Sequence, residues 1–482
     1  IGSIAELKER GDNVPDDIEL HKPYIDKITI KCPHCGKTMH RTPEVIDCWF
    51  DSGSMPFAQH HYPFENKEVF DQQFPAQFIS EAVDQTRGWF YSLLAISTLL
   101  FDKAPYENVI VLGHVLDKDG NKMSKSKGNA VDPMEALNQH GADAIRWYFY
   151  ENSQPWLPNR FYDDAVTEGQ RKFIGTLWNT YAFFVLYANI DEFDASKYTL
   201  DKDSLTIMDK WILSRVNKLI KDTTNNLEKF NLGIAYDNIV SFAWDEFCDW
   251  YVEMVKTRLY DQENETRAAA IWTLKNVMID ILKLLHPFMP FITEEIFCNI
   301  QSDEDTIVIS AWPEYKEDDV YAKEEHDIEI IKEAVKAIRN IRAEKDVKPS
   351  KQVPVYVVTD NDDVVNAFNN GKDFFASLSK ASEVTVTGSK ENVPADSCSA
   401  VIEGAGIYIP LAELVDIKEE LERLNKEAGR LNGEIKRCEG MLSNEKFISK
   451  APEAKVNEEK AKLAKYKEML EKVEAEIKDL SK

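Results

Sequence analysis

The sequence predicts a multidomain protein with an α/β segment first, then a helical bundle, a small α/β unit and a C-terminal antiparallel coiled coil. A strand-like apolar run, a polar loop and a helix start follow one another in residues 108–133. Apolar residues recur at helical spacing through residues 160–300, and at alternating spacings of three and four along the tail. The length of 482 residues agrees with this order, because it suggests ~3–4 domains.

The composition indicates a folded protein of a reducing compartment. With 43% hydrophobic and 11% aromatic residues, the chain can bury large cores, which argues against wholesale disorder. Only two of the seven cysteines are closely spaced, which indicates the cytosol and no disulfide framework. No apolar run reaches the ~18 residues of a membrane span. We therefore expect a cytoplasmic protein without a membrane-spanning segment.

The net charge of −26 restricts how the chain can bind nucleic acid. The charge argues against nonspecific attraction to phosphates as the main way in which the chain binds nucleic acid. An RNA partner therefore requires local basic patches. The chain begins with Ile1 and has no basic-then-apolar signal segment. This start suggests the downstream piece of a longer protein.

Residues 1–45 are polar and contain a Cys-x-x-Cys-Gly sequence, residues 32–36. Two thiolates on a tight turn can share one tetrahedral metal, so Cys32 and Cys35 are candidate zinc ligands. A complete site needs two more ligands, and no convincing second pair lies nearby. The nearby candidates are His34, His40 and Cys48. A zinc knuckle over residues 31–36 and a knuckle without metal both stay open.

The next stretches combine aromatic and acidic residues. Residues 47–57 are aromatic and turn-rich, so they suit either a pocket wall or a core. Residues 77–80 read as a strand end, and a long amphipathic helix is predicted from Asp84 through Leu100. Acidic and amide groups at the carboxyl end of a strand occupy the place where doubly wound sheets bind ligands. Helix caps are commonly acidic too, so both interpretations remain.

Residues 121–129, here called the lysine loop, carry three lysines in six positions. Residues 108–113 before the loop read as a buried strand, and Asp132 and Pro133 after it read as the cap and first residue of a helix. Lysines on a Ser/Gly-rich loop can move onto oxyanions as charge develops in phosphoryl or adenylyl chemistry. A solvated surface turn is the alternative for such a composition.

The string Lys122-Met123-Ser124-Lys125-Ser126 matches the signature loop of the class I aminoacyl-tRNA synthetases. With residues 47–57, 80–90 and 111–148, it makes residues ~1–207 resemble the isoleucyl-tRNA synthetases. The resemblance implies that residues 1–160 are the distal half of a Rossmann-type α/β catalytic domain. It also implies that residues 141–146 form a helix packed behind the loop.

The same resemblance implies ATP with magnesium as the cofactor and a branched aliphatic amino acid as substrate. Lys122 and Lys125 would be catalytic, because they would stabilise the expelled pyrophosphate. The other residues implied to contact the nucleotide or the adenylate are Glu81, Asp84, Gln85, Trp89, Gly113, His114, Ser124 and Ser126. The family's His-x-Gly-His motif does not occur in the chain, and an editing domain has no room. The 482 residues alone are therefore predicted not to form adenylate.

Residues 161–320 are predicted to form a helical bundle with an aromatic core. They resemble the anticodon-binding bundle of the same synthetase subfamily. From about Trp211 to the end of the chain the resemblance is to valyl-tRNA synthetase, whereas residues 208–215 are similar in both families. Either a recombination joined two genes there, or the sequence record is itself a join.

Within residues 321–410, a basic helix is predicted over residues 325–352. A small α/β unit follows, with strands at 353–358, at 383–386 and from residue 400 onward. The helix ends in Arg339, Arg342, Lys345, Lys348 and Lys351. These cations suit a phosphate-contacting edge. A solvated helix end, with cations favoured by the helix dipole, is the alternative.

Residues 411–482 carry two heptad helices joined at 443–452, which predicts an antiparallel hairpin. Cys438 falls on the seam, and Lys446, Lys450 and Lys455 cluster at the tip. The hairpin resembles the tRNA-binding coiled-coil arm of valyl-tRNA synthetase. A structural or dimerising hairpin is the alternative.

The sequence thus predicts a fragment of a monomeric aminoacyl-tRNA ligase for isoleucine or valine, with the corresponding tRNA as partner. A noncatalytic tRNA-binding or scaffolding module, made of the bundle and the arm, is the alternative.

Overall fold

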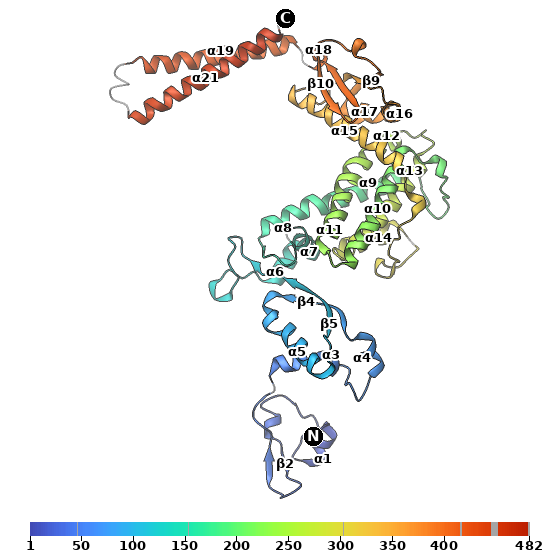
Figure 1. Ribbon diagram of the computed structural model, residues 1–482, viewed down its shortest axis with the longest axis vertical. Coiled ribbons are helices and arrows are strands. Elements are labelled where there is room, and N and C mark those ends of the chain that lie inside the picture. Colours follow the sequence, from blue (N-terminus) through green and yellow to red (C-terminus); the bar gives the residue numbers. More distant parts are fainter. Residues whose placement is uncertain (46, 153, 302, 415–416, 445–451, 481–482) are drawn as a thin grey trace. The chain divides into compact units, whose positions relative to one another are not determined.

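The computed structural model of the chain is shown in Figure 1. It describes residues 1–482 except 46, 153, 302, 415–416, 445–451 and 481–482. The contacts divide the chain into two compact units. Unit 1 comprises residues 1–132 and 152–162, and unit 2 comprises residues 133–151 and 163–482.

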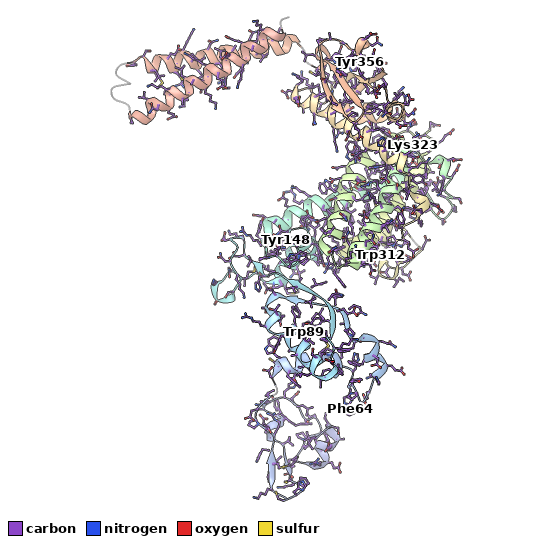
Figure 2. The ribbon with its side chains drawn as sticks, viewed as in Figure 1. Phe64, Trp89, Tyr148, Trp312, Lys323 and Tyr356 are labelled. Atoms are coloured by element: carbon purple, nitrogen blue, oxygen red, sulfur yellow. The ribbon has the colours of Figure 1, made fainter. Side chains whose placement is uncertain are left out.

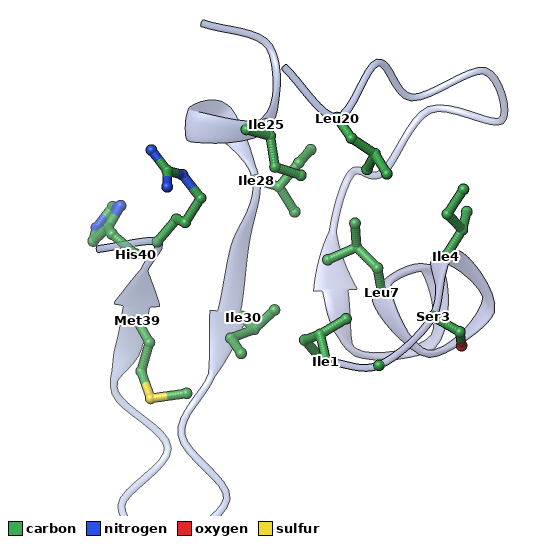
Figure 3. A pocket seen from close by; sticks show the side chains of 12 residues that line it. Ile1, Ser3, Ile4, Leu7, Leu20, Ile25, Ile28, Ile30, Met39 and His40 are labelled. Carbon is green, nitrogen blue, oxygen red and sulfur yellow. The ribbon is translucent and has the colours of Figure 1, made fainter. Parts of the chain in front are cut away.

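Unit 1 begins with a small antiparallel sheet of order β1-β2-β3 beside one helix. The elements are α1 (Ile4–Arg10), β1 (Gly11–Asp12), β2 (Thr29–Lys31) and β3 (Thr38–His40). Ser3 starts α1 by accepting a hydrogen bond from the Glu6 amide. Helix and strands line an apolar pocket of about 630 Å³, drawn in Figure 3, where Leu7, Ile28 and Ile30 face one another.

The rest of unit 1 is a β–α–β unit preceded by three short helices. These are α2 (Cys48–Gly53), α3 (Met55–Ala58) and α4 (Lys67–Gln73); the unit itself is β4 (Ala76–Ala82), α5 (Trp89–Phe101) and β5 (Tyr106–Leu112). The two strands pair in parallel, from Ala76 opposite Tyr106 to Ala82 opposite Leu112. The short strand β6 (Val115–Leu116), just before the lysine loop, pairs in parallel with β7 (Asn159–Arg160).

Two predictions about this unit are wrong in detail. The helix predicted from Asp84 begins only at Trp89, because a 3₁₀ turn at Val83–Arg87 and then Gly88 come first. The strand predicted to be buried is half open: Val109 and Leu112 are 37% and 40% exposed. Parallel strands bury both faces only when neighbours cover them, and this sheet has two strands.

Unit 2 contains the helical bundle. Its helices are α6 (Pro133–His140), α7 (Ala142–Glu151), α8 (Asp163–Gly169), α9 (Gly175–Ile190), α10 (Ile207–Glu228), α11 (Leu232–Ser241), α12 (Val252–Tyr260), α13 (Arg267–Leu285), α14 (Pro290–Ile300) and α15 (Ala322–Glu344). π-Helical turns at Gln170–Ile174 and Phe242–Tyr251 continue into α9 and α12. The predicted aromatic core is present, with Trp211, Phe247 and Tyr251 almost fully buried.

Helix α7, predicted to pack behind the lysine loop, makes polar contacts with the start of α14 and the residues before it. Arg146 donates hydrogen bonds to the carbonyl oxygens of Phe288 (2.7 Å) and Pro287 (2.8 Å). Asp143 accepts the amides of Phe291 (3.3 Å) and Ile292 (2.6 Å) at the start of α14. These contacts explain why residues 133–151 group with unit 2.

The small α/β unit has the sheet order β10-β11-β8-β9. Its elements are β8 (Val353–Val358), α16 (Asp362–Asn370), α17 (Lys372–Ser379), β9 (Ala381–Thr387), β10 (Ser397–Ile402) and β11 (Ala405–Pro410), followed by α18 (Leu411–Leu414). β8 and β9 are parallel, and the other pairs are antiparallel. The predicted strands are present, whereas the predicted helix 325–352 ends at Glu344.

The tail forms two long helices, α19 (Ile417–Leu442) and α21 (Glu453–Leu480), which lie side by side in Figure 1. Leu424, Leu431 and Cys438 of α19 are buried, as the seam prediction requires for Cys438. Of the predicted tip lysines, Lys446 and Lys450 lie outside the described residues and Lys455 is exposed on α21. No helix within the described ranges is long and apolar enough to cross a bilayer.

Candidate nucleotide-binding site

The lysine loop is held closed by Asp117 and Asn129. One carboxylate oxygen of Asp117 accepts the amides of Asp119 (3.0 Å) and Asn121 (2.8 Å), and the other accepts the Asn129 side-chain amide (2.8 Å). Asn129 in turn accepts the Ser124 amide at 2.9 Å. The Asn129 hydrogen bond, more than any other contact, lowers the pKa of Asp117 below its usual value. Sequence reasoning missed this brace, although its two residues flank the signature string.

The brace leaves the loop's cationic side chains turned to solvent. Lys122 and Lys127 are exposed, and within the described part of the chain Lys122 has no ion-pair partner. The hydroxyls of Ser124 and Ser126 lie 2.8 Å apart. The backbone of Lys125 forms a 3₁₀ turn, while its side chain lies outside the described residues. A closed backbone with an ammonium group turned to solvent favours an anion-binding loop over a purely structural turn.

The predicted acidic residues lie where the parallel strands end. Glu81 faces Val111 across the β4–β5 pair, so it and Gly113 share the carboxyl edge. Glu81 and Asp84 are exposed, and Gln85 donates to Asp84 at 3.3 Å. The structure therefore brings these predicted residues to one edge of one unit.

Trp89 and Gln85 form the wall beside this edge, together with α2. Gln85 accepts the Trp89 amide at 2.9 Å, and the Trp89 indole donates to the Ser52 carbonyl at 3.3 Å. A Cβ on Gly88 would lie 2.7 Å from the Gln85 side-chain oxygen and 2.8 Å from the ring of Trp49. A larger residue where α5 begins would therefore displace the Gln85 or Trp49 side chain. The aromatic stretch 47–57 thus contributes a wall, through Trp49.

Gly113 and His114 are fixed by the returning chain at residues 155–159. The Gly113 amide donates to the Pro155 carbonyl at 2.8 Å, and the His114 carbonyl accepts the Asn159 amide at 3.0 Å. A Cβ on Gly113 would lie 2.1 Å from the Leu157 carbonyl oxygen, so only glycine fits. The backbone is consequently held tightly at the strand end where a ligand would approach.

The Cys-x-x-Cys sequence forms a tight turn between β2 and β3. The Gly36 amide donates to the Cys32 carbonyl at 2.9 Å, and Gly36 has a φ of +70°, which favours glycine. Hydrogen bonds from the His34 and Cys35 amides and the Cys35 thiol lower the pKa of Cys32. No group of three or more possible metal ligands occurs among the described residues, so His34, His40 and Cys48 do not complete a site with this pair.

The basic end of α15 is only partly available to phosphate. Arg342 is 7% exposed, and its guanidinium donates to the carbonyls of Lys351 (2.7 Å), Lys348 (3.2 Å) and Pro349 (3.5 Å). Arg339 donates to the Leu378 carbonyl and lies 5.9 Å from the Trp250 ring centre. These two arginines hold the α/β unit on α15, which the prediction of a phosphate-contacting edge did not anticipate.

Comparison with known families matches three consecutive parts of the chain. Residues 3–156 match the model described as "tRNA synthetases class I (I, L, M and V)". Residues 209–357 match "Anticodon-binding domain of tRNA ligase", and residues 416–481 match "Valyl tRNA synthetase tRNA binding arm". The chain belongs to the class I aminoacyl-tRNA synthetases.

Individual members of this synthetase family are similar over most of the chain. It is 54% identical over 354 residues to the isoleucine–tRNA ligase of Clostridium kluyveri, which covers 72% of the chain and 34% of that relative. It is 44% identical over 451 residues to the valine–tRNA ligase of Clostridium tetani, covering 93% and 50%. The chain therefore spans about a third to a half of the length of the curated relatives it matches.

A solved synthetase shares the fold. The LeuRS of Agrobacterium radiobacter K84, in a ternary complex with tRNA and LeuAMS, aligns with a TM-score of 0.50 at 22% identity over 61% of this chain and 36% of that one. A mixed α/β, mostly helical multidomain architecture is thus shared with this class.

The predicted join near residues 208–215 is not marked by the end of either alignment. Alignments that cover 72% and 93% of 482 residues must both include this segment. The similarity to isoleucine- and valine-specific relatives therefore overlaps across the middle of the chain. A two-family join at this position stays a prediction.

Proposed function

We propose that the chain is the distal part of an ATP-dependent isoleucyl- or valyl-tRNA synthetase, which forms an aminoacyl-adenylate and transfers the amino acid to tRNA. The observation that supports this most is the lysine loop, braced by Asp117 and Asn129 in the same unit as the carboxyl edge of β4 and β5. The loop offers cations that suit phosphates, and the edge offers polar groups that suit an amino acid and a ribose.

Each predicted site residue then has a role. Lys122 and Lys125 stabilise the negative charge that develops on the departing pyrophosphate, and Ser124 and Ser126 line the same loop. Glu81, Asp84 and Gln85 contact the adenylate, with Trp89 as a wall. Gly113 and His114 lie near the adenine. Magnesium would arrive with ATP and be held largely by its phosphates, since the described residues gather no ligand cluster of their own.

The remaining parts are proposed to bind tRNA of an isoleucine or valine isoacceptor. In this assignment residues 161–320 are the anticodon-binding bundle, residues 321–410 are a connecting unit, and residues 411–482 are the tRNA-binding arm. Residues 1–160 are the distal, Rossmann-type part of the catalytic domain. We propose a monomer, in which the arm is an antiparallel coiled coil that follows the small α/β unit in the chain.

The chain by itself is expected to give no ATP–pyrophosphate exchange above background with isoleucine or valine, because it contains no His-x-Gly-His motif. The measurement is incorporation of radiolabelled pyrophosphate into ATP. Robust turnover by these 482 residues would overturn this expectation.

The positive control is the chain extended upstream by an isoleucyl-type catalytic segment that carries the motif. In that protein Lys122→Ala or Lys125→Ala should lower exchange by ~10²–10³-fold, the usual effect of losing a group that stabilises developing charge. Lys127→Ala, a change of another lysine in the same loop, should leave exchange nearly unchanged. An equal loss in all three variants would contradict the assigned roles.

We further propose that Cys32 and Cys35 are two of the four ligands of a structural zinc ion. The amides of His34 and Cys35 stabilise a thiolate at Cys32, which is the form that binds zinc. Cobalt added to the chain should give a thiolate-to-metal absorption band, and Cys32→Ser should abolish it. Cys298→Ser, which changes an exposed cysteine elsewhere in the chain, should leave the band intact. A band that survives Cys32→Ser would rule the pair out.

A further inference from the structure

The small α/β unit leaves one face of its sheet without a helix. Alternate residues of the two central strands, Val355 and Val357 of β8 and Ile407 and Ile409 of β11, belong to the hydrophobic core. The residues between them therefore point to the opposite face. On the outer strands Val401 is 88% exposed, so this face meets solvent there.

Two tyrosines lie next to each other at the centre of this open face. Tyr408 of β11 is directly opposite Tyr356 of β8, and β11 and β8 are the two inner strands of the sheet. Their cross-strand neighbours complete one row: Thr385 of β9 pairs with Tyr356, and Ser399 of β10 pairs with Tyr408. Figure 2 labels Tyr356 on this sheet. The row is thus hydroxyl, ring, ring, hydroxyl.

The ring of Tyr408 lies flat along its own strand because the neighbouring position has no side chain. A Cβ on Gly406 would be 2.9 Å from the Tyr408 ring and 3.0 Å from its hydroxyl. The Lys390 ammonium lies 4.8 Å from the centre of the ring, and Lys390 is exposed. A planar group stacked on Tyr408 would take the place of this ammonium, which is then free to meet an anion.

Aromatic rings on the inner strands of a four-stranded sheet, with hydroxyls and a lysine beside them, suit the stacking of unpaired bases. The bases would stack on the tyrosine rings, and a phosphate would pair with the lysine. The position of the sheet in the chain also favours RNA. The anticodon-binding family model ends within β8, after Tyr356, and the tRNA-binding-arm model begins at residue 416, shortly after β11.

We propose that the open face of this sheet, centred on Tyr356 and Tyr408, binds single-stranded RNA by stacking two bases on the two rings while Lys390 pairs with a phosphate. The choice of RNA rests on the proposed function. The site itself is additional to the bundle, the arm and the lysine loop, and in the complete assembly its RNA would be an unpaired segment of the tRNA.

The test uses the full chain and fluorescein-labelled oligouridylate and oligoadenylate of about ten nucleotides, a length within the usual site sizes for such platforms. Binding is followed by fluorescence anisotropy at low salt. Tyr356→Ala and Tyr408→Ala should each weaken binding by about ten-fold, the usual range for loss of one stacked base. Tyr356→Phe and Tyr408→Phe keep the rings and should stay within about two-fold.

The matched control is Tyr315→Ala. This tyrosine also has a lysine over its ring, Lys221 at 4.4 Å, but it lies in a loop of the bundle region and not on the sheet. It should leave oligonucleotide binding unchanged. Thermal melting of each variant, followed by circular dichroism, verifies that the alanine proteins are folded.

Three results would overturn the inference. These are no oligonucleotide binding by the wild-type chain, equal binding by the Tyr356→Ala/Tyr408→Ala protein, or binding of a proline-rich peptide, and not of RNA, to this face. Filter binding of whole tRNA separates this inference from the proposed function. A chain that binds tRNA but is insensitive to both tyrosines refutes only the sheet site. A chain that binds the oligonucleotides through the tyrosines but not tRNA refutes only the proposed function.

Discussion

Replacing Asp209 by alanine is expected to lower the free energy of unfolding of the bundle by about 3–5 kcal/mol, the usual cost of leaving one buried charge unpaired. Asp209 is fully buried at the start of α10. Its carboxylate accepts hydrogen bonds from Arg258 at 2.7 and 2.9 Å and from the Tyr251 hydroxyl at 2.7 Å. Arg258 is itself 5% exposed, so the substitution would leave its guanidinium without a counter-charge inside the bundle.

Urea titration followed by tryptophan fluorescence measures this cost. The matched control is Glu168→Ala, which removes the acidic partner of an exposed pair with Lys172 and should not move the bundle's transition. The double change Asp209→Leu with Arg258→Met should recover much of the loss, because well-packed apolar residues can replace a buried pair. A wild-type transition midpoint for Asp209→Ala would contradict this account.

Removing residues 411–482 is expected to weaken tRNA binding by about ten-fold or more and to reduce its salt dependence. This segment contains 16 basic and 17 acidic residues, whereas the whole chain has a net charge of −26, so the segment is nearly neutral on an acidic protein. Lys455, Lys460 and Lys465 are exposed on α21 and have no ion-pair partner among the residues described. An RNA backbone would therefore meet available cations there with little net repulsion.

Filter binding of isoleucine and valine tRNAs to residues 1–410 and to the full chain, at several salt concentrations, makes this measurement. The shortened protein should keep the melting transition of the bundle, since among the described residues Leu414 is the one member of the hydrophobic core that the removal takes away. Lys462→Ala is a suitable control on the intact arm, because Lys462 is already paired with Glu458 at 2.7 Å. Unchanged affinity after removal of the segment would exclude the arm as a tRNA contact.

The sequence by itself determined the elements whose signals are local. The apolar run at 353–358 predicted β8 at its observed bounds, and helical periodicity predicted that residues 161–320 are mainly helical, as α10 and α13 are. The signature string identified the family that the comparisons then matched. Such signals survive because each depends on a few neighbouring residues and not on what the element meets in space.

Only the tertiary structure decided how side chains are used. Arg342 looked available in the sequence, yet three carbonyls of the following loop occupy its guanidinium. Asp84 looked like the start of a helix, yet α5 begins at Trp89, where Gly88 and Trp89 contact residues 49–52. The sequence did not indicate that Asp117 and Asn129 are joined by the hydrogen bond that braces the lysine loop.

The two tyrosines of the open sheet show the physical reason most clearly. Tyr356 and Tyr408 are distant in sequence, and only the register of β8 with β11 makes them neighbours. Strand register, and the choice of which face the helices cover, result from long-range packing that periodicity cannot report. Local motifs could therefore be predicted from the sequence, whereas contacts between residues distant in sequence were known only from the tertiary structure.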